Sequence, residues 1–191
     1  MVYGNNNIGK STQSKLLVER IMRGGMPVHY VKYPVYDFAP TGPMINAYLR
    51  EGNPHELSCR EAQTLYAMNR YHFEPMLKKW LDAGDCVVAE DYVGTSLAWG
   101  IGNGVDKKYL LEINSGLLKE DITLFMDGQR FTAAKEAKHI HEQNDALVEK
   151  VGVVYRELAK EFGWTAVDVS GSIEEIHERM WNTLCSVNGK K

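Results

Sequence analysis

The feature that most constrains this chain is a phosphate-binding loop close to its start. Residues 4–12 read Gly-Asn-Asn-Asn-Ile-Gly-Lys-Ser-Thr and fit the pattern G-x-x-x-x-G-K-[ST]. Gly4 and Gly9 allow backbone conformations in which successive N–H groups turn toward one anion. Lys10 adds a flexible cation for the β- and γ-phosphates, and the Ser11 hydroxyl can ligate Mg²⁺. Because a helix over 11–23 would point its positive end at the same anion, the sequence predicts a nucleoside triphosphate site.

The loop starts unusually early. Only three residues precede Gly4, whereas a phosphate-binding loop is expected to follow a buried strand of about five or six residues. Either the first strand is short, or residues upstream of Met1 are missing from this chain.

The rest of the chain alternates between strand-like and helix-like stretches. Strands are predicted over 28–33, 86–89, 122–126 and 165–169, and helices over 41–50, 58–81, 106–118 and 145–162, with a last helix after 172. Capping boxes at Ser58 and Ser172 mark two of the helix starts. This order predicts one domain, 1–191, with a doubly wound α/β fold of the P-loop NTPase type: a parallel sheet of about five strands flanked by helices. Residues 128–144, rich in charge and poor in large apolar residues, are expected to form a lid.

Composition excludes several classes of partner. The chain has 191 residues, of which 44% are apolar, and a net charge of −3, which argues against a general nucleic-acid or membrane surface. Cys59, Cys86 and Cys185 have no metal-binding spacing and are interpreted as reduced thiols. No signal peptide and no apolar run near ~18 residues is present, so a cytoplasmic protein is expected.

Four segments resemble the thymidylate kinase family. They are residues 9–14 with 17–19, the run Tyr-Ala-Met-Asn-Arg at 66–70, Glu-Asp-Tyr at 90–92, and Asp-Ile-Thr-Leu-Phe-Met-Asp at 121–127. The similarity runs nearly from end to end. It implies transfer of the ATP γ-phosphoryl group to thymidylate with Mg²⁺, nucleotides as the partners, and a homodimer.

The same resemblance implies roles for individual residues. Tyr66 falls where a ring stacks on the pyrimidine, Arg70 where a guanidinium binds the base carbonyl, and Trp99 where a ring crowds the sugar 2′ position. Asn6 replaces a carboxylate that binds the 3′-hydroxyl, and Glu90 replaces an aspartate that orients Mg²⁺ through water. The full candidate set is catalytic Lys10, Glu90, Lys135 and Lys138; ATP-binding Gly4, Asn7, Gly9, Lys10, Ser11 and Thr12; substrate-binding Asn6, Lys32, Tyr66, Arg70, Asp91, Tyr92 and Trp99; and metal-binding Ser11 and Glu90.

Three departures concern the charges around the acceptor. Asp91 and Tyr36 stand where the family has phosphate-binding arginines, and a carboxylate repels a dianion. Asn7 and Glu136 stand at the two places where members carry a catalytic arginine, which leaves Lys135 and Lys138 as the nearest lid cations. Lys32 is the one candidate for the acceptor phosphate that this reasoning supplies.

Alternatives therefore stay open. The acceptor could instead be a deoxynucleoside or a modified pyrimidine nucleotide, or the chain could bind nucleotides with reduced turnover. Tyr66 and Trp99 also suit ordinary core packing, and Arg70 also suits a solvated helix face. The leading prediction is ATP-dependent phosphorylation of thymidylate.

Overall fold

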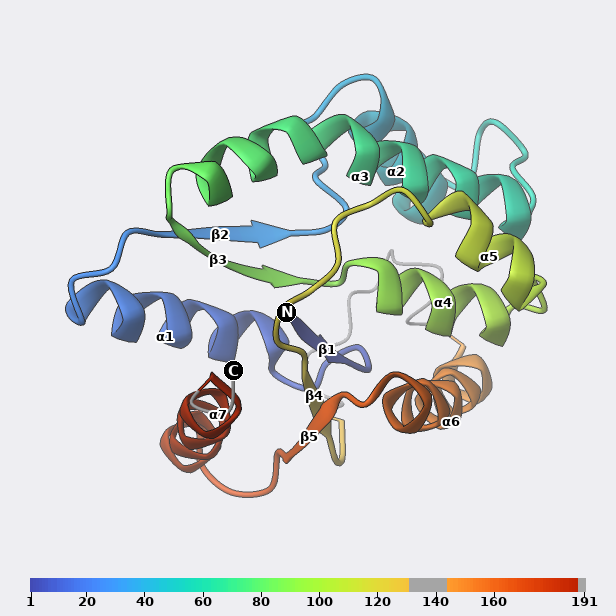
Figure 1. Ribbon diagram of the computed structural model, residues 1–191. Helices are drawn as coiled ribbons and strands as arrows, with labels where there is room; N and C mark the ends of the chain where they lie inside the picture. Colours follow the sequence, from blue (N-terminus) through green and yellow to red (C-terminus); the bar gives the residue numbers. More distant parts are fainter. Residues whose placement is uncertain (131–143, 189–191) are drawn as a thin grey trace.

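A computed structural model describes residues 1–130 and 144–188 of the chain and places a parallel sheet at its centre (Figure 1). The five strands are β1 (Val2–Gly4), β2 (Val28–Lys32), β3 (Cys86–Glu90), β4 (Leu124–Asp127) and β5 (Thr165–Asp168). They lie in the order β2-β3-β1-β4-β5, and all neighbouring pairs are parallel. The predicted doubly wound α/β sheet is confirmed.

Helices cover both faces of this sheet (Figure 1). They are α1 (Lys10–Arg23), α2 (Thr41–Arg50), α3 (Cys59–Asp82), α4 (Val93–Gly102), α5 (Lys107–Ile113), α6 (Asp145–Phe162) and α7 (Ile173–Asn188). Apolar residues of α1 and α7 form one core with the sheet, and those of α4, α5 and α6 form a second core on the other face. A smaller cluster joins α2 to α3. The carboxyl ends of the strands therefore point toward loops that these helices hold in place.

The first strand is short, as one of the two sequence interpretations allows. β1 has three residues and lies between β3 and β4, with Val2 opposite both Glu90 and Leu124. All three of its residues are buried, so the loop that follows starts from the middle of the sheet. Ligands that bind this loop lie at the centre of the fold.

Helix α4 was not anticipated, because three glycines in ten residues argue against a helix. The structure uses these glycines for close packing. A Cβ atom at Gly94 would lie 2.6 Å from the Trp164 ring, one at Gly100 2.6 Å from Leu110, and one at Gly102 2.6 Å from Val151. Tertiary contacts between α4, α5 and α6 therefore outweigh the low helix propensity of this segment.

Most other predicted boundaries are correct to within a few residues. The largest difference is α5, which ends at Ile113 and not at 118. Both capping boxes form: the Ser58 side chain accepts from the Glu61 amide, and the Ser172 side chain accepts from that of Glu175. Most of the predicted lid lies outside the described residues. Within the described ranges, no helix combines the length and the apolar character needed to span a membrane.

Candidate active site

The loop after β1 is shaped to surround an anion. Gly4, Asn7 and Gly9 have positive φ angles of 155°, 59° and 92°. Glycine adopts positive φ more easily than other residues, as was expected for Gly4 and Gly9. A Cβ at Gly4 would lie 2.8 Å from the Met126 carbonyl oxygen, so the loop also needs glycine there for space. Helix α1 begins without a side-chain cap and without an acidic residue in its first turn. Its first N–H groups are therefore suited to binding phosphate.

Lys10 is held at the centre of this loop. Its Nζ donates to the carbonyl oxygens of Gly4 and Asn5, both at 2.9 Å, and lies 3.5 Å from Asp91 Oδ1. Burial is the largest effect on the Asp91 carboxyl and raises its pKa, while the charge of Lys10 acts in the opposite direction. Asp91 also accepts a hydrogen bond from Thr95 Oγ1 at 3.1 Å. The carboxylate at this unusual position is thus paired with the loop lysine, and the charge of Lys32 acts on its pKa in the same direction as that of Lys10.

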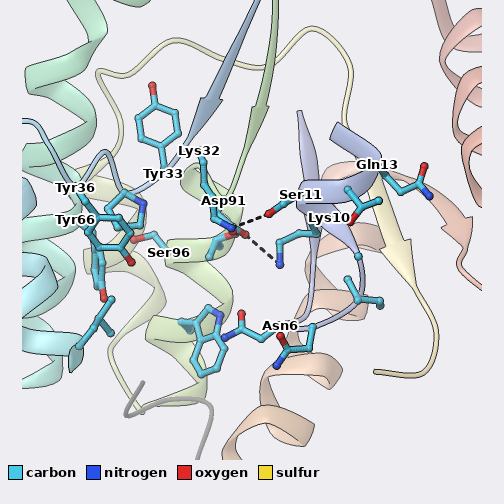
Figure 2. Close-up of a pocket in the computed structure, with 18 of the residues that line it drawn as sticks. Asn6, Lys10, Ser11, Gln13, Lys32, Tyr33, Tyr36, Tyr66, Asp91 and Ser96 are labelled. Carbon is cyan, nitrogen blue, oxygen red and sulfur yellow. Dashed lines mark hydrogen bonds and ion pairs between the residues drawn. The ribbon is translucent and has the colours of Figure 1, made fainter. Parts of the chain in front are cut away.

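Glu90 lies directly beneath the loop and is completely buried. Its Oε1 accepts hydrogen bonds from Ser11 Oγ and the Tyr30 hydroxyl, both at 2.7 Å, and lies 3.1 Å from Lys32 Nζ. Burial tends to raise the pKa of Glu90, but Lys32 and these hydrogen bonds hold it below its ordinary value. Lys32 Nζ also donates to Ser11 Oγ at 2.8 Å. Figure 2 marks the Lys32–Ser11 and Lys10–Asp91 contacts with dashed lines.

A second cluster of polar residues fixes Arg70 at the far end of the site. Its Nε and Nη2 donate to Asn114 Oδ1 at 3.1 and 2.9 Å, and Nη2 also donates to Ser96 Oγ at 2.9 Å. Ser96 in turn donates to Gln63 Oε1. Burial lowers the pKa of Arg70 to about 10, and none of its hydrogen bonds goes to a carboxylate. Its Nη1 makes no hydrogen bond within the described part of the chain and remains for a ligand.

One cavity of about 700 Å³ connects the two clusters. Figure 2 shows Lys10 and Ser11 on one side of it and Tyr36 and Tyr66 on the other, with Asp91 between. The predicted residues that line this cavity are Asn6, Asn7, Gly9, Lys10, Ser11, Thr12, Lys32, Tyr66, Arg70, Asp91 and Trp99. Gly4 and Glu90 lie just behind them and contact Lys10 and Ser11. Most described residues of the predicted set therefore lie around one continuous cavity, and their individual roles stay predictions.

Among the described residues, one member of the predicted set is not brought to this cavity. Tyr92 is 2% exposed and packs with Tyr33 in the core, at 5.0 Å between ring centres, so it does not line the site as expected of a substrate ligand. Lys135 and Lys138 lie outside the described residues. Their catalytic role stays a prediction.

Several residues line the site that sequence reasoning did not select. Gln63 and Ser96 lie beside Arg70, Arg50 lies near Tyr36, and Gly171, Ser172, Ile173 and Ile176 come from the start of α7. The capping box at Ser172 located the start of α7, but no local signal placed that start against the phosphate-binding loop. The bond from Gln13 Nε2 to the Ile173 carbonyl at 2.9 Å now shows that contact.

The oxygen atoms at the loop suit a magnesium ion. Mg²⁺ binds hydroxyl and carboxylate oxygens and usually keeps several waters, so one or two protein ligands suffice. Ser11 Oγ and the Glu90 carboxylate supply such a pair. In the described ranges no three His, Cys, Asp or Glu side chains gather to hold a metal on their own. The site therefore fits a magnesium ion that arrives with a nucleotide.

Comparison with known proteins gives a consistent result. A family model described as thymidylate kinase matches residues 2–180. Human thymidylate kinase is 29% identical over 180 residues, which cover 92% of this chain and 84% of that protein. A probable thymidylate kinase of Methanocaldococcus jannaschii is 29% identical over 189 residues, or 96% of this chain and 94% of that protein. Among solved structures, thymidylate kinase from Candida albicans shares the fold, with a TM-score of 0.82 at 22% identity over 100% of this chain and 92% of that one.

Proposed function

The chain belongs to the thymidylate kinase family, and from this premise we propose that the cavity between the loop and Arg70 binds ATP and thymidylate end to end. The enzyme transfers the γ-phosphoryl group of ATP to the phosphate of dTMP and releases ADP and dTDP. One observation carries the proposal: the 700 Å³ cavity runs without interruption from Lys10 to Arg70. Phosphoryl transfer needs little covalent help from the protein, so alignment of two nucleotides in one cavity is the main requirement.

The loop holds the donor. The uncapped start of α1 presents N–H groups to the phosphates of ATP. Lys10 Nζ is already fixed by two carbonyl oxygens at the centre of the loop. It can therefore exchange its contact with Asp91 for the β- and γ-phosphates without moving far.

Ser11 and Glu90 are the residues that would hold Mg²⁺. When bound, the ion neutralises charge that develops on the transferred phosphoryl group. Because the pKa of Glu90 lies below its ordinary value, its carboxylate is ionised at neutral pH. Tyr30 and Lys32 hold this carboxylate in place through the contacts to Oε1.

The far end of the cavity selects the base. Arg70 presents the N–H groups of Nη1, which pair with a carbonyl oxygen and not with an amino group. Thymine and uracil carry a carbonyl at the position where cytosine carries an amine, so the pocket favours thymine and uracil over cytosine. Tyr66 and Trp99 line the same cavity and provide rings against which the base and sugar can pack.

The finer features stay predictions. They are contact of Asn6 with the 3′-hydroxyl, the lid over 128–144 with Lys135 and Lys138, a single domain over 1–191, a homodimer, and a cytoplasmic location.

A panel of acceptors tests the function. ADP release from ATP and Mg²⁺ is measured with dTMP, dUMP, dCMP and thymidine. We expect turnover with dTMP and much less with dCMP. Lys10→Ala should reduce kcat by about 10²–10³-fold, the scale of one lost electrostatic contact to a transition state. Lys15→Ala removes an exposed lysine of the same helix and serves as the control. Turnover of thymidine without turnover of dTMP would overturn the proposal.

A further inference from the structure

The acceptor of this reaction carries a phosphate that needs cationic partners. A nucleotide with its base at Arg70 would have this phosphate between Arg70 and the loop, within the same cavity. Among residues 1–130 and 144–188, four cationic side chains line the cavity: Lys10, Lys32, Arg50 and Arg70. Lys10 belongs to the donor, and the hydrogen bonds of Arg70 fix it at the base end. Lys32 and Arg50 are the other two cationic side chains of this lining. They are the candidates to bind a phosphate that lies between the base end of the cavity and the loop.

Arg50 reaches this space from the end of α2. Its guanidinium carbon lies 4.7 Å from the centre of the Tyr36 ring, and its Nη1 donates to Asn46 Oδ1 at 3.3 Å. Burial raises the pKa of Tyr36, whereas a hydrogen bond from Arg50 and the charge of Lys32 act to lower it. The charges of Arg50 and Lys32 therefore both act on Tyr36, against a weaker opposite effect of Asp91. Figure 2 shows Tyr36 and Tyr66 side by side on the wall that faces Lys32 and Lys10.

Lys32 approaches the same space from the end of β2. Its side chain is 48% exposed, so it remains in contact with the cavity while it touches Glu90 and Ser11. Burial tends to lower its pKa, but Glu90 and Asp91 raise it, and the amine stays charged at neutral pH. Asp91 pairs with Lys10 on the loop side.

We propose that Arg50, together with Lys32 and assisted by the Tyr36 hydroxyl, holds the phosphate of the acceptor nucleotide. This inference rests on the proposed function, since it names the phosphate ligands of the same acceptor site. The planar guanidinium of Arg50 can bind two phosphate oxygens at once, and Lys32 adds a point charge on the side nearer the donor. The cation that the family carries at position 36 or 91 is thus replaced by one on a neighbouring helix.

The experiment compares two ligands that differ only by the phosphate. Dissociation constants for thymidine and dTMP are measured by titration calorimetry at pH 8 without ATP, for the native chain and for Arg50→Gln, Arg50→Lys and Lys32→Gln. The control is Arg60→Gln, which removes another arginine stacked on a tyrosine, at 4.0 Å from the Tyr109 ring and outside the cavity. The ratio of the two constants isolates the contribution of the phosphate.

In Arg50→Gln we expect dTMP to bind about tenfold more weakly or worse, with thymidine unchanged, which is the scale of a charge-assisted hydrogen bond. Arg50→Lys should recover part of this loss. Lys32→Gln should also weaken the binding of dTMP relative to that of thymidine, and Arg60→Gln should match the native chain. An unchanged ratio in Arg50→Gln, or an equal loss for both ligands, would overturn the inference. Native turnover of dTMP, measured separately, shows whether the proposed function stands in that case.

Discussion

Within the described ranges, Arg70 is a buried cation with no carboxylate among its hydrogen-bond partners. Its side chain is 3% exposed and bonds only to the neutral oxygens of Asn114 and Ser96. Such a group contributes to ligand binding more than to folding. We therefore expect Arg70→Met to damage activity while the fold tolerates it.

The magnitudes follow from the structure. Burial lowers the pKa of Arg70 from 12.5 to about 10, and about 1.36 kcal/mol per pKa unit gives roughly 3 kcal/mol disfavouring the charged form in the folded state. Methionine removes this term but leaves oxygens of Asn114 and Ser96 without their donor, which costs about 1–3 kcal/mol. The two effects nearly cancel. The free energy of unfolding should change by less than about 2 kcal/mol, whereas KM for dTMP should rise about 10- to 100-fold with the loss of one charged hydrogen bond.

Urea denaturation and steady-state kinetics on the same preparations check this prediction. A pH series adds a sign test. The folded-state pKa of Arg70 is depressed, so its unfavourable contribution to the native chain is constant below about pH 10 and shrinks above it. The difference in stability between the native chain and Arg70→Met should be flat from pH 6 to 9. A loss of more than about 4 kcal/mol with unchanged KM for dTMP would refute the reasoning and assign Arg70 to the core.

Two further predictions concern other titratable groups. Asp91→Asn removes the carboxylate that competes with ATP for Lys10, so KM for ATP should fall several-fold; a rise would show that Asp91 assists the donor. His177 is 9% exposed, and neither ring nitrogen has a hydrogen-bond partner within the described ranges. Its pKa is lowered by burial and by Arg20, against Glu178 and Glu19, so stability should fall as the pH drops below the unfolded value near ~6.5. Urea denaturation at pH 7.5 and 5 should show a smaller loss for His177→Leu than for the native chain, and equal losses would contradict the assignment.

The fold was predictable wherever a local pattern has one physical meaning. The loop at 4–12, the capping boxes at Ser58 and Ser172, and the apolar run at 86–89 each specify an element and one of its ends. Helix α4 could not be found in this way, because the glycines that oppose it locally are the residues that let α5 and α6 approach. The early end of α5 has a similar origin. Asn114, just beyond it, donates to the Leu110 carbonyl and accepts from Arg70, so a distant helix uses this residue.

The sequence was enough to select candidate ligand-binding residues, but not the residues that hold them in position. Lys10, Tyr66 and Arg70 belong to recognisable runs, and the structure brings all three to one cavity. Gln63 and Ser96 carry no such signal, because a neutral polar residue inside a helical pattern has the same appearance whether it holds a ligand or packs in a core. Their role depends on hydrogen bonds between α3 and α4. Information of this kind exists only in the three-dimensional arrangement.

The contacts of Asp91 bear on how the acceptor phosphate can be bound. A carboxylate at position 91 would repel the acceptor if it faced the acceptor site. Its contacts with Lys10 and Thr95 fix it beside the loop. Among the described lining residues, α2 contributes Leu49 and Arg50 and no acidic side chain, so this wall adds positive charge to the cavity. Arg50 lies in the last turn of α2, where the sequence alone suggests no more than a favourable charge at a helix end. On the proposal made for the acceptor phosphate, Arg50 in the last turn of α2 thus supplies the positive charge that positions 36 and 91 lack.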